Sequence, residues 1–579
     1  MASDQRFPSW LAICGWLCCA SRAAAAVLDA PSVENFGHWA YGRVTVLGDY
    51  LYMNGGEVSQ LVDGEFASWR ASDPMNSTIS IDLKASWTTA NAVRRTIAKP
   101  EDAPITNWPV LWPDASAGVF YSWGGAYAYG LDIRNNTPQW KFTADGSGSG
   151  TWSSEVNTND ARYNQLHKTE LGAVVTINDT VGLNIGGIAH GWTEVDGGDR
   201  HAIPGMVAFD MENKLWQNGT SSFSPFGTGS IASARAEYMP SFGPSGLVVL
   251  LGGYQPSTVG SPDAEYALSF FDFRNLTLFD PETKKTYWQT TTGDFPDHPR
   301  TEFCTAIVSD TASGGHEIFI YGGQNGRDNY DYADAFVLSL PGFFWKRLPD
   351  SPAGRRSCHD CAAVGVGKRQ VLAVGGLQAH GGKGWSHQDP APLGLQVFDM
   401  TELAWKNNYD AQAAEYVRAD DIAQWYSGGS LEKVSWSSPE LEAMFVTNGS
   451  AGTSQSKADG DGSSGAPIGA IAGGVAGGVI VLLGISLAVW LLRRRKSQKP
   501  QEEAELEAAA QPDVTPSPEK RDVQQPTAED VKLELEAISS PVSAPYPSEL
   551  SGSSSPWHGD PTAVVAELDG GYQQTYQAR

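Results

Sequence analysis

The sequence predicts an all-β fold, a β-propeller in which six four-stranded sheets pack around a central axis. Two observations lead to it. The 579 residues include 63 Gly, 34 Pro and 20 Trp, and only 18% are charged, which favours turn-rich β structure over helical bundles. In addition, apolar runs that end in Gly-Gly recur along the chain, and each is followed by a second apolar run and a Trp.

Six glycine doublets carry this repeat. Doublets also arise by chance at this Gly content, so the evidence is their shared context of a downstream strand, a polar turn and a Trp. The doublets are Gly55 and Gly56, Gly124 and Gly125, Gly186 and Gly187, Gly252 and Gly253, Gly322 and Gly323, and Gly375 and Gly376. The tryptophans that follow them are Trp87, Trp140, Trp216, Trp288, Trp345 and Trp405.

Each repeat is interpreted as an antiparallel meander. The run that ends in Gly-Gly is the second strand, the next run is the third, and the Trp marks the start of the outer strand. Gly allows a positive φ and a close approach of two backbones, and Trp offers a large apolar face to a neighbouring sheet. One such sheet cannot bury both faces, so the six are expected to pack radially. Whether residues 406–447 complete a seventh blade, and which segment closes the ring, stay open.

The N-terminal 26 residues are predicted to be a secretory signal peptide. Arg6 precedes an apolar run over residues 10–20, and small residues follow at 23–26. The alternative, a membrane anchor, needs about 20 apolar residues, and this run is about half as long. The propeller is then expected over residues 30–447, outside the cytosol.

A transmembrane helix is predicted over residues 468–492, which carry no charge. A Gly/Ser-rich linker precedes it at 448–467. The cations Arg493, Arg494, Arg495 and Lys496 follow it and are expected to stay on the cytoplasmic side, so the N-terminal domain faces outward. Gly469, Gly473 and Gly477 recur every fourth residue, which permits a homodimer through close helix packing, although Gly is also common in membrane helices.

Residues 493–579 are predicted to form a basic juxtamembrane cluster and a disordered acidic tail. Six Asn-x-Ser/Thr glycosylation acceptors all precede the predicted membrane helix, in agreement with this topology. They are Asn76, Asn135, Asn178, Asn218, Asn275 and Asn448. The plasma membrane is the expected location, with the endomembrane system as the alternative.

The formal charge of −26 argues against a nucleic-acid partner, because a polyanion needs a basic surface and the only basic cluster of note adjoins the predicted membrane helix. Residues 1–492 retain a charge of −20. This acidity favours a cationic or metal-bridged partner over an anionic one.

The repeats resemble the kelch repeat, and more closely the galactose oxidase/kelch-type propellers found as single-pass membrane proteins at the surface of filamentous fungi. The resemblance covers roughly residues 35–495. Its most specific stretches are 300–304 with 318–323, 335–345, and 369–376 with 397–405, followed by the Gly/Ala-rich membrane segment. It implies a kelch β-propeller. Such proteins carry a further Cys after the last Gly-Gly, and residues 377–394 contain none, so no cysteine pairing is carried over.

Three cysteines remain after removal of the signal peptide: Cys304, Cys358 and Cys361. The segments around Cys304 and Cys361 align on the inner strands of adjacent blades. A disulfide from Cys304 to Cys361 or to Cys358 is therefore expected to join these blades. The alternative, a redox-active Cys358-His-Asp-Cys361 motif, would need a helix N-terminus, and this segment is predicted to be a strand.

No catalytic residue, metal ligand or cofactor is assigned from the sequence. A copper radical oxidase, the activity that the galactose oxidase name raises, needs two His, two Tyr and a Cys cross-linked to one Tyr. The nine His of the ectodomain are scattered, with no His-x-His or adjacent pair. His359 and Asp360, near the inner strands, are the residues to inspect first, although a structural role for the His is the plainer explanation.

The function expected is non-catalytic binding of a protein or glycan by the propeller loops, with a membrane-tethered oxidase or other secreted enzyme as the alternative. Repeats of roughly 65 residues exceed the usual kelch length of about 50, so insertions are expected in loops. The longest are residues 58–78, 144–164, 189–201 and 378–393.

Overall fold

The computed structural model describes residues 32–446 except 67–71, 135–136, 156–158, 220–228, 256–268, 326–327 and 381–383. The predicted signal peptide, linker, membrane helix, basic cluster and tail all lie outside these residues. Within them, no helix is both long enough and apolar enough to span a bilayer. The described chain is mostly β structure.

Among the described residues, six antiparallel meanders follow one another, called sheets 1 to 6 below. Their first strands are β2 (Arg43–Leu47), β10 (Val110–Asp114), β15 (Ala173–Ile177), β21 (Arg235–Met239), β28 (Cys304–Asp310) and β34 (Asp360–Val364). Their second strands are β3 (Tyr50–Asn54), β11 (Val119–Trp123), β16 (Val181–Ile185), β22 (Leu247–Leu251), β29 (Gly315–Tyr321) and β35 (Gln370–Val374).

The meanders are completed by two further strands each. The third strands are β6 (Ser77–Asp82), β13 (Gln139–Ala144), β19 (Met206–Asp210), β25 (Asn275–Phe279), β32 (Ala335–Leu340) and β36 (Leu395–Asp399). The outer strands are β8 (Arg94–Ala98), β14 (Gly150–Glu155), β20 (Leu215–Gly219), β26 (Thr286–Thr290), β33 (Phe344–Leu348) and β37 (Ala404–Lys406). The two-residue strand β27 (Thr292–Gly293) adds to sheet 5 in parallel with β33.

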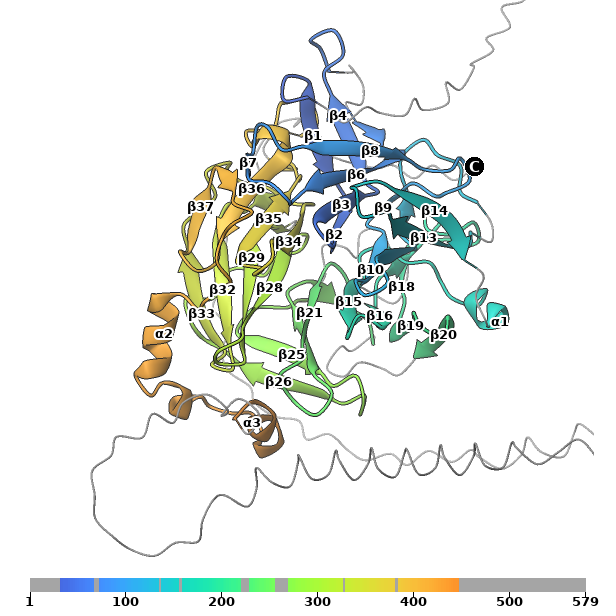
Figure 1. Cartoon of the computed structure of the whole chain (residues 1–579). Coiled ribbons are helices and arrows are strands. Elements are labelled where there is room, and N and C mark those ends of the chain that lie inside the picture. Colours follow the sequence, from blue (N-terminus) through green and yellow to red (C-terminus); the bar gives the residue numbers. More distant parts are fainter. Residues whose placement is uncertain are drawn as a thin grey trace, which may run out of the picture. The chain divides into compact units, whose positions relative to one another are not determined.

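The first strands of the six sheets lie around a common centre (Figure 1). Each contacts the first strand of the next sheet along the chain, and β34 of sheet 6 contacts β2 of sheet 1. This arrangement is consistent with the predicted β-propeller.

Glycine doublets join each sheet to the next. The last residue of each second strand directly precedes its doublet, and all twelve glycines have positive φ. The N–H of the second glycine donates a hydrogen bond of 2.6 to 3.0 Å to a carbonyl in the segment that leads into the following sheet. The acceptors, from the first doublet to the last, are the carbonyl oxygens of Thr106, Thr169, Ile231, Arg300, Arg356 and Trp39. The last of these bonds, from Gly376 to Trp39, joins sheet 6 to sheet 1.

Apolar packing supports the same junction between sheets 6 and 1. Leu51 and Ile81 of sheet 1 form one buried cluster with Leu372 and Val397 of sheet 6. Outside the sheets, β7 (Trp87–Thr88) pairs with β38 (Asn408–Tyr409), which ties the end of sheet 6 to the turn of sheet 1 between β6 and β8.

The tryptophans do not all take the place expected of them. Trp216, Trp288, Trp345 and Trp405 lie in outer strands, but the side chain of Trp288 is 54% exposed. Trp140 lies in the third strand of sheet 2 rather than in the outer strand. Residues 130–133, predicted to be the third strand, form no strand, and β13 takes that place. Trp87 lies in β7, outside the four strands of sheet 1, and packs on Tyr409 with ring centroids 5.1 Å apart.

The C-terminal part of the described chain forms helices rather than a seventh sheet. Residues after β38 include α2 (Asp420–Ser427), a 3-10 turn at Leu431–Lys433 and α3 (Pro439–Val446). Arg418, just before α2, donates a hydrogen bond of 2.7 Å to the buried carboxylate of Glu317 in β29. Phe445 of α3 packs against Phe242 and Phe343, which follow β21 and β32.

Two sides of the ring can now be distinguished. We call "turn face" the side that carries the turns between first and second strands and between third and outer strands; α2 and α3 pack there. We call "loop face" the opposite side, which carries the glycine doublets and the segments that lead into each first strand.

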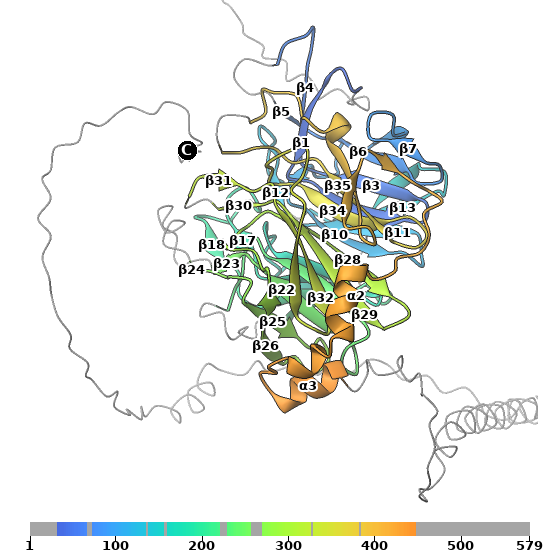
Figure 2. The same cartoon turned by 90° about the vertical axis from the view of Figure 1, so that its left-hand side faces the viewer.

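Short additional strands follow the doublets on the loop face (Figure 2). Four of these pairs are β9 (Thr106–Asn107) with β12 (Ala126–Tyr127), β17 (Ile188–Ala189) with β18 (His201–Ala202), β23 (Tyr254–Gln255) with β24 (Ser269–Phe270), and β30 (Gln324–Asn325) with β31 (Tyr330–Asp331). A three-stranded sheet of β1 (Phe36–Ala40), β4 (Glu57–Gln60) and β5 (Ser72–Pro74) does the same after the first doublet.

Candidate functional site at the channel mouth

Six residues with positive φ surround the axis of the ring on the loop face. Each stands two positions before the first strand of a sheet, with φ between 49° and 65°. They are Tyr41, Trp108, Leu171, Ser233, Glu302 and Cys358, called the mouth ring below. Backbone hydrogen bonds run between neighbouring members, such as Tyr41 N–H to the Cys358 carbonyl at 3.0 Å and Cys358 N–H to the Glu302 carbonyl at 3.0 Å. The left-handed conformation turns each segment from the loop face into the central strand.

A narrow pocket of about 20 Å³ opens inside the mouth ring. Five members of the ring line it, all but Tyr41, together with Gly42, Arg43, Ala234, Arg235 and His359. Tyr41 lies beside it, with its ring centroid 4.6 Å from that of Trp108. A pocket of this size admits a small polar group rather than a whole ligand molecule.

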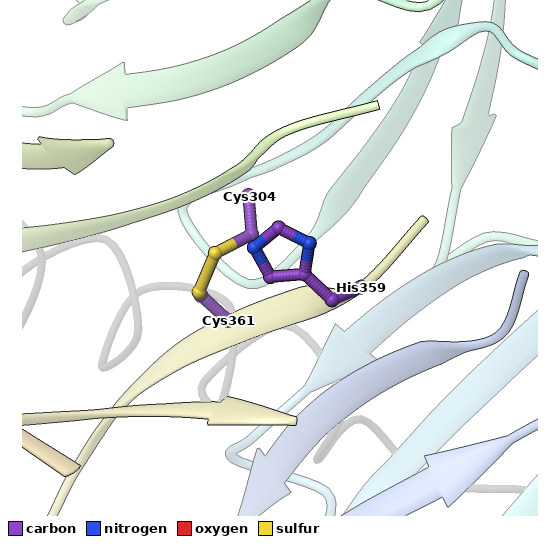
Figure 3. Close-up of side chains that lie close together, drawn as sticks. All are labelled: Cys304, His359 and Cys361. Atoms are coloured by element: carbon purple, nitrogen blue, oxygen red, sulfur yellow. A yellow bond between two sulfur atoms is a disulfide. The ribbon is translucent and has the colours of Figure 1, made fainter. Parts of the chain in front are cut away.

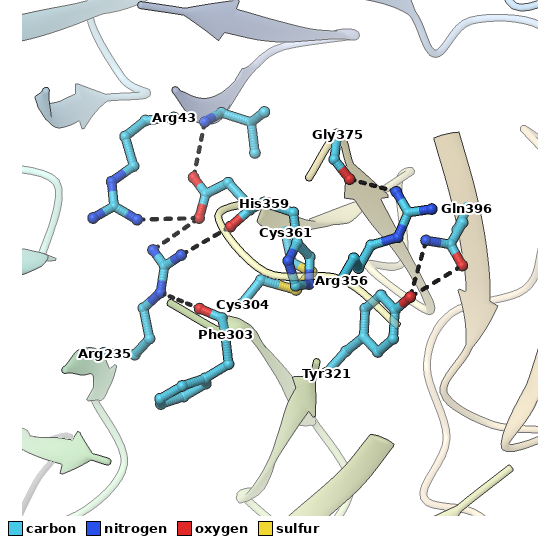
Figure 4. Close-up of a disulfide and its surroundings, with 12 residues drawn as sticks. Arg43, Arg235, Phe303, Cys304, Tyr321, Arg356, His359, Cys361, Gly375 and Gln396 are labelled. Atoms are coloured by element: carbon cyan, nitrogen blue, oxygen red, sulfur yellow. Dashed lines mark hydrogen bonds and ion pairs between the residues drawn. A yellow bond between two sulfur atoms is a disulfide. The ribbon is translucent and has the colours of Figure 1, made fainter. Parts of the chain in front are cut away.

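Arg43 and Arg235 converge on one carboxylate, that of Asp360 (Figure 4). All three guanidinium nitrogens of Arg235 donate a hydrogen bond. Nε donates to the Phe303 carbonyl at 2.6 Å, Nη1 to Asp360 Oδ1 at 2.9 Å and Nη2 to the His359 carbonyl at 3.0 Å. The second oxygen of Asp360 accepts the Val44 N–H at 2.9 Å. This carboxylate is therefore held by two first strands, β2 and β21, besides its own strand β34.

Arg43 is less completely bound than Arg235. Its Nη1 lies 3.5 Å from Asp360 Oδ1, and its buried Nε has no hydrogen-bond partner among the described residues. The side chain is 12% exposed and lines the pocket. Two guanidinium groups thus share one carboxylate.

Glu302 and Cys358 form the acidic side of the mouth ring. The Cys358 thiol donates to Glu302 Oε2, and Gln324 Nε2 donates to the same oxygen at 2.9 Å. Burial raises the pKa of the Glu302 carboxyl, and the nearby carboxylates Glu170 and Asp331 raise it further. The pKa of the Cys358 thiol is also raised, by burial and by Glu302. The Cys358 side chain is therefore a protonated thiol.

The disulfide joins Cys304 of β28 to Cys361 of β34, the first of the two pairings expected from the sequence. It links the central strands of sheets 5 and 6, and Cys358 is left as a buried free thiol. His359 lies against the disulfide (Figure 3). Burial, with Arg356 and Arg235 nearby, lowers the pKa of His359 well below its ordinary value, so the imidazole is neutral.

His359 and the two half-cystines place three ligand-type atoms within 4.8 Å of one another. Zinc and copper(I) bind thiolates, however, and sulfurs joined in a disulfide are no longer thiolates. In this oxidised state the cluster is therefore a structural junction. Asp360, the other residue singled out from the sequence, acts as the shared acceptor for Arg235 and Arg43 rather than as a free carboxylate.

The predicted glycosylation acceptors lie on both faces. Asn178, Asn218 and Asn275 are exposed, and Asn76 is partly buried. Asn135 and Asn448 fall outside the described residues, as do Gly469, Gly473 and Gly477 and the four cations from Arg493 to Lys496.

The predicted long loops agree only in part with the structure. Residues 189–201 and 378–393 lie on the loop face, and 58–78 contribute β4 and β5 there. Residues 144–164 are not an insertion, because they contain β14, the outer strand of sheet 2, and the short helix α1 (Asp160–Tyr163). The mouth ring was not anticipated at all.

The fold defines a class: a mostly β ring of repeated sheets with a polar pocket at its axis, an arrangement consistent with a β-propeller. No protein-family model matches the chain. It is similar to a kelch repeat-containing protein of Arthroderma benhamiae, with 24% identity over 533 residues, which cover 78% of this chain and 74% of that protein. This similarity supports a kelch-type β-propeller.

Proposed function

We propose that this protein is a membrane-anchored binding module of the cell surface: a six-bladed kelch propeller that holds a glycan or protein ligand on its loop face without transforming it. The observation that carries the proposal is the mouth ring, where six segments from six sheets converge around one polar pocket. A ligand site on segments held by rigid sheets costs little entropy to organise.

The placement of the C-terminal helices favours the loop face as the binding side. The described chain ends in α3, which packs on the turn face against Phe242 and Phe343. The turn face is therefore partly covered by the chain itself.

The topology rests on the sequence features described above: the signal peptide, the uncharged segment 468–492 and the cations after it. Accessibility of epitope tags in intact cells tests it. One tag follows residue 26 and another follows Arg579. We expect an antibody to label the first tag without permeabilisation and the second only after it. Labelling of the C-terminal tag on intact cells would contradict the proposed orientation.

Glycan removal gives an independent measure of the same topology. Peptide N-glycosidase should lower the apparent mass of the wild-type chain. A variant with all three exposed acceptors changed, Asn178→Gln, Asn218→Gln and Asn275→Gln, should lose a corresponding part of the shift. An unchanged mobility in both would contradict passage through the secretory pathway.

Retention on insoluble cell-wall polysaccharide tests the binding function. The full chain in detergent should be retained and should elute with soluble fragments of the same polysaccharide. Metal analysis of the same preparation separates this function from the alternative. Stoichiometric copper together with an oxidised-tyrosine absorption band would refute the binding module in favour of an oxidase.

A further inference from the structure

The buried histidine beside the disulfide has no hydrogen-bond partner for its side chain. His359 is 1% exposed, and neither Nδ1 nor Nε2 has a partner among the described residues. Buried polar atoms normally have one, because a nitrogen that leaves water without a new partner loses its hydrogen bonds and gains none. The imidazole of His359 is therefore available to a further group.

The atoms next to this imidazole are of the types that zinc binds. One ring nitrogen of His359 and the Sγ atoms of Cys304 and Cys361 lie within 4.8 Å of one another (Figure 3). In a tetrahedral zinc site, bonds of about 2.0–2.3 Å set neighbouring ligand atoms about 3.3–3.8 Å apart. The Cα atoms of the two cysteines are 5.3 Å apart, so side-chain rotation alone can bring their sulfurs to this spacing once the disulfide is open.

The charges around the cluster suit a divalent cation held by two thiolates. The nearby cations Arg235 and Arg356 are already paired, with the carboxylates of Asp360 and Asp389. Two thiolates offset the two charges of Zn²⁺, so the occupied site adds no net charge to this buried region. The imidazole of His359 is neutral, which is the form that binds metals.

We propose that the reduced chain binds one Zn²⁺ through Cys304, His359 and Cys361, so that disulfide and metal are alternative links between sheets 5 and 6. A dithiol reductant supplies the two electrons and two protons that open the S–S bond, and is itself oxidised to a disulfide. Zn²⁺ then takes the place of the two thiol protons, which pass to solvent. Three protein ligands leave the fourth position of the metal to a water molecule.

The channel-mouth pocket gives the ion a path to the cluster. His359 lines this pocket, and its volume of about 20 Å³ admits a particle of the size of a water molecule. Cys358 also lines the pocket, but its thiol donates to Glu302 and does not belong to the cluster. The zinc site does not depend on the proposed glycan or protein ligand, so either proposal can fail without the other.

Zinc titration of the full chain in detergent, with the reduced and the oxidised protein side by side, tests the proposal. A phosphine opens the disulfide in this experiment, because a dithiol would itself bind zinc. We expect the reduced chain to bind one Zn²⁺ per chain more than the oxidised chain, with release of about two protons per zinc at pH 7, since both thiols lose theirs. Equal zinc binding by the two forms, or binding without proton release, would overturn the proposal.

Variants identify the histidine ligand. His359→Leu removes no side-chain hydrogen bond and should weaken zinc binding to the reduced chain by at least about 100-fold, because loss of a ligand costs more than loss of a group that only orients one. The matched control is His316→Leu, at another buried histidine, which lies in β29 and bonds to Ser309; it should bind zinc as the wild type does. If His359→Leu does not fold, Cys361→Ser should show the same loss. Unchanged affinity in the folded ligand variant, or an equal loss in His316→Leu, would overturn the proposal.

Discussion

The glycine doublets allow a sharp test of how the sheets are joined. Gly55 has φ +71°, and a Cβ on it would lie 2.6 Å from the Thr106 carbonyl oxygen and 2.8 Å from Pro109 Cγ, both in the segment that leads into sheet 2. Gly118, in the turn between β10 and β11, has a similar φ of +65°, but a Cβ on it would meet nothing within 4 Å. The two positions therefore share the backbone conformation and differ in the neighbouring sheet.

The expected costs of Ala at these two positions follow from this difference. The left-handed conformation costs a residue with a Cβ about 1–2 kcal/mol at either site. At Gly55 the new methyl must also push sheet 2 away by about 0.7 Å to reach an ordinary C···O separation, at a cost of about 1–3 kcal/mol. The same movement stretches the 2.9 Å bond from Gly56 N–H to the Thr106 carbonyl, which is worth about 1 kcal/mol.

Urea unfolding of the two variants, followed by tryptophan fluorescence, measures the result. Gly55→Ala should lose about 3–5 kcal/mol of unfolding free energy, and Gly118→Ala about 1–2 kcal/mol. Equal losses in the two variants would refute the view that the doublets hold neighbouring sheets in direct contact.

Three further predictions concern buried groups. The double change Cys304→Ser and Cys361→Ser opens a loop of 57 residues and should lower the free energy of unfolding in urea by about 4 kcal/mol. The control Cys358→Ser, at the free thiol, should lower it by less than about 1 kcal/mol. Similar losses in the two variants would contradict the disulfide. Arg418→Met leaves the buried Glu317 carboxylate without its cation and should lower the free energy of unfolding by about 3–5 kcal/mol. Lys285→Met, at an exposed pair with Glu440, should lower it by less than about 1 kcal/mol. A larger loss in Lys285→Met would show that α2 is not held by the pair of Arg418 with Glu317. Burial raises the pKa of Glu237, in β21, from 4.5 to about 7, so the folded state loses stability as pH rises through this range. Glu237→Gln should therefore be more stable than the wild type at pH 8, by about 3 kcal/mol, and lose that gain near pH 4. A gain independent of pH would contradict this origin.

The sheets could be predicted from the sequence because each repeat has the same residue type, a glycine doublet, directly after its second strand. The positions next to the second strands must be Gly, since a Cβ there meets the backbone of the following sheet, as at Gly55. The outer strands were predicted less well. A Trp can bury its ring from several places in a sheet, so Trp140 and Trp87 occupy a third strand and a separate pair of short strands.

The C-terminal segment was left open by the sequence, because its glycine doublet, Gly428 and Gly429, is not followed by the continuous apolar run of the repeat. Asp420 and Asp421 in the first turn of α2 are the helix signal that it does contain. The helices are held by tertiary contacts that spacing cannot reveal, above all Arg418 with Glu317, which are far apart in the sequence.

The candidate site could not be predicted from residue type. The members of the mouth ring share a backbone conformation and a place two residues before a strand, but they are Tyr, Trp, Leu, Ser, Glu and Cys. Alignment of the repeats on their first strands would have found the positions. The pairing of Arg43 and Arg235 with Asp360 depends on three strands from different sheets, which only the folded chain brings together.

The central claim is that the ligand binds at the channel mouth on the loop face. Retention of the full chain on cell-wall polysaccharide, compared between Ser233→Tyr and Thr180→Tyr, tests it most directly. Ser233 lines the pocket, whereas Thr180 is exposed in a turn of sheet 3 on the turn face. The account predicts that Ser233→Tyr, once shown to be folded, loses retention while Thr180→Tyr keeps that of the wild type. Full retention of folded Ser233→Tyr would contradict it.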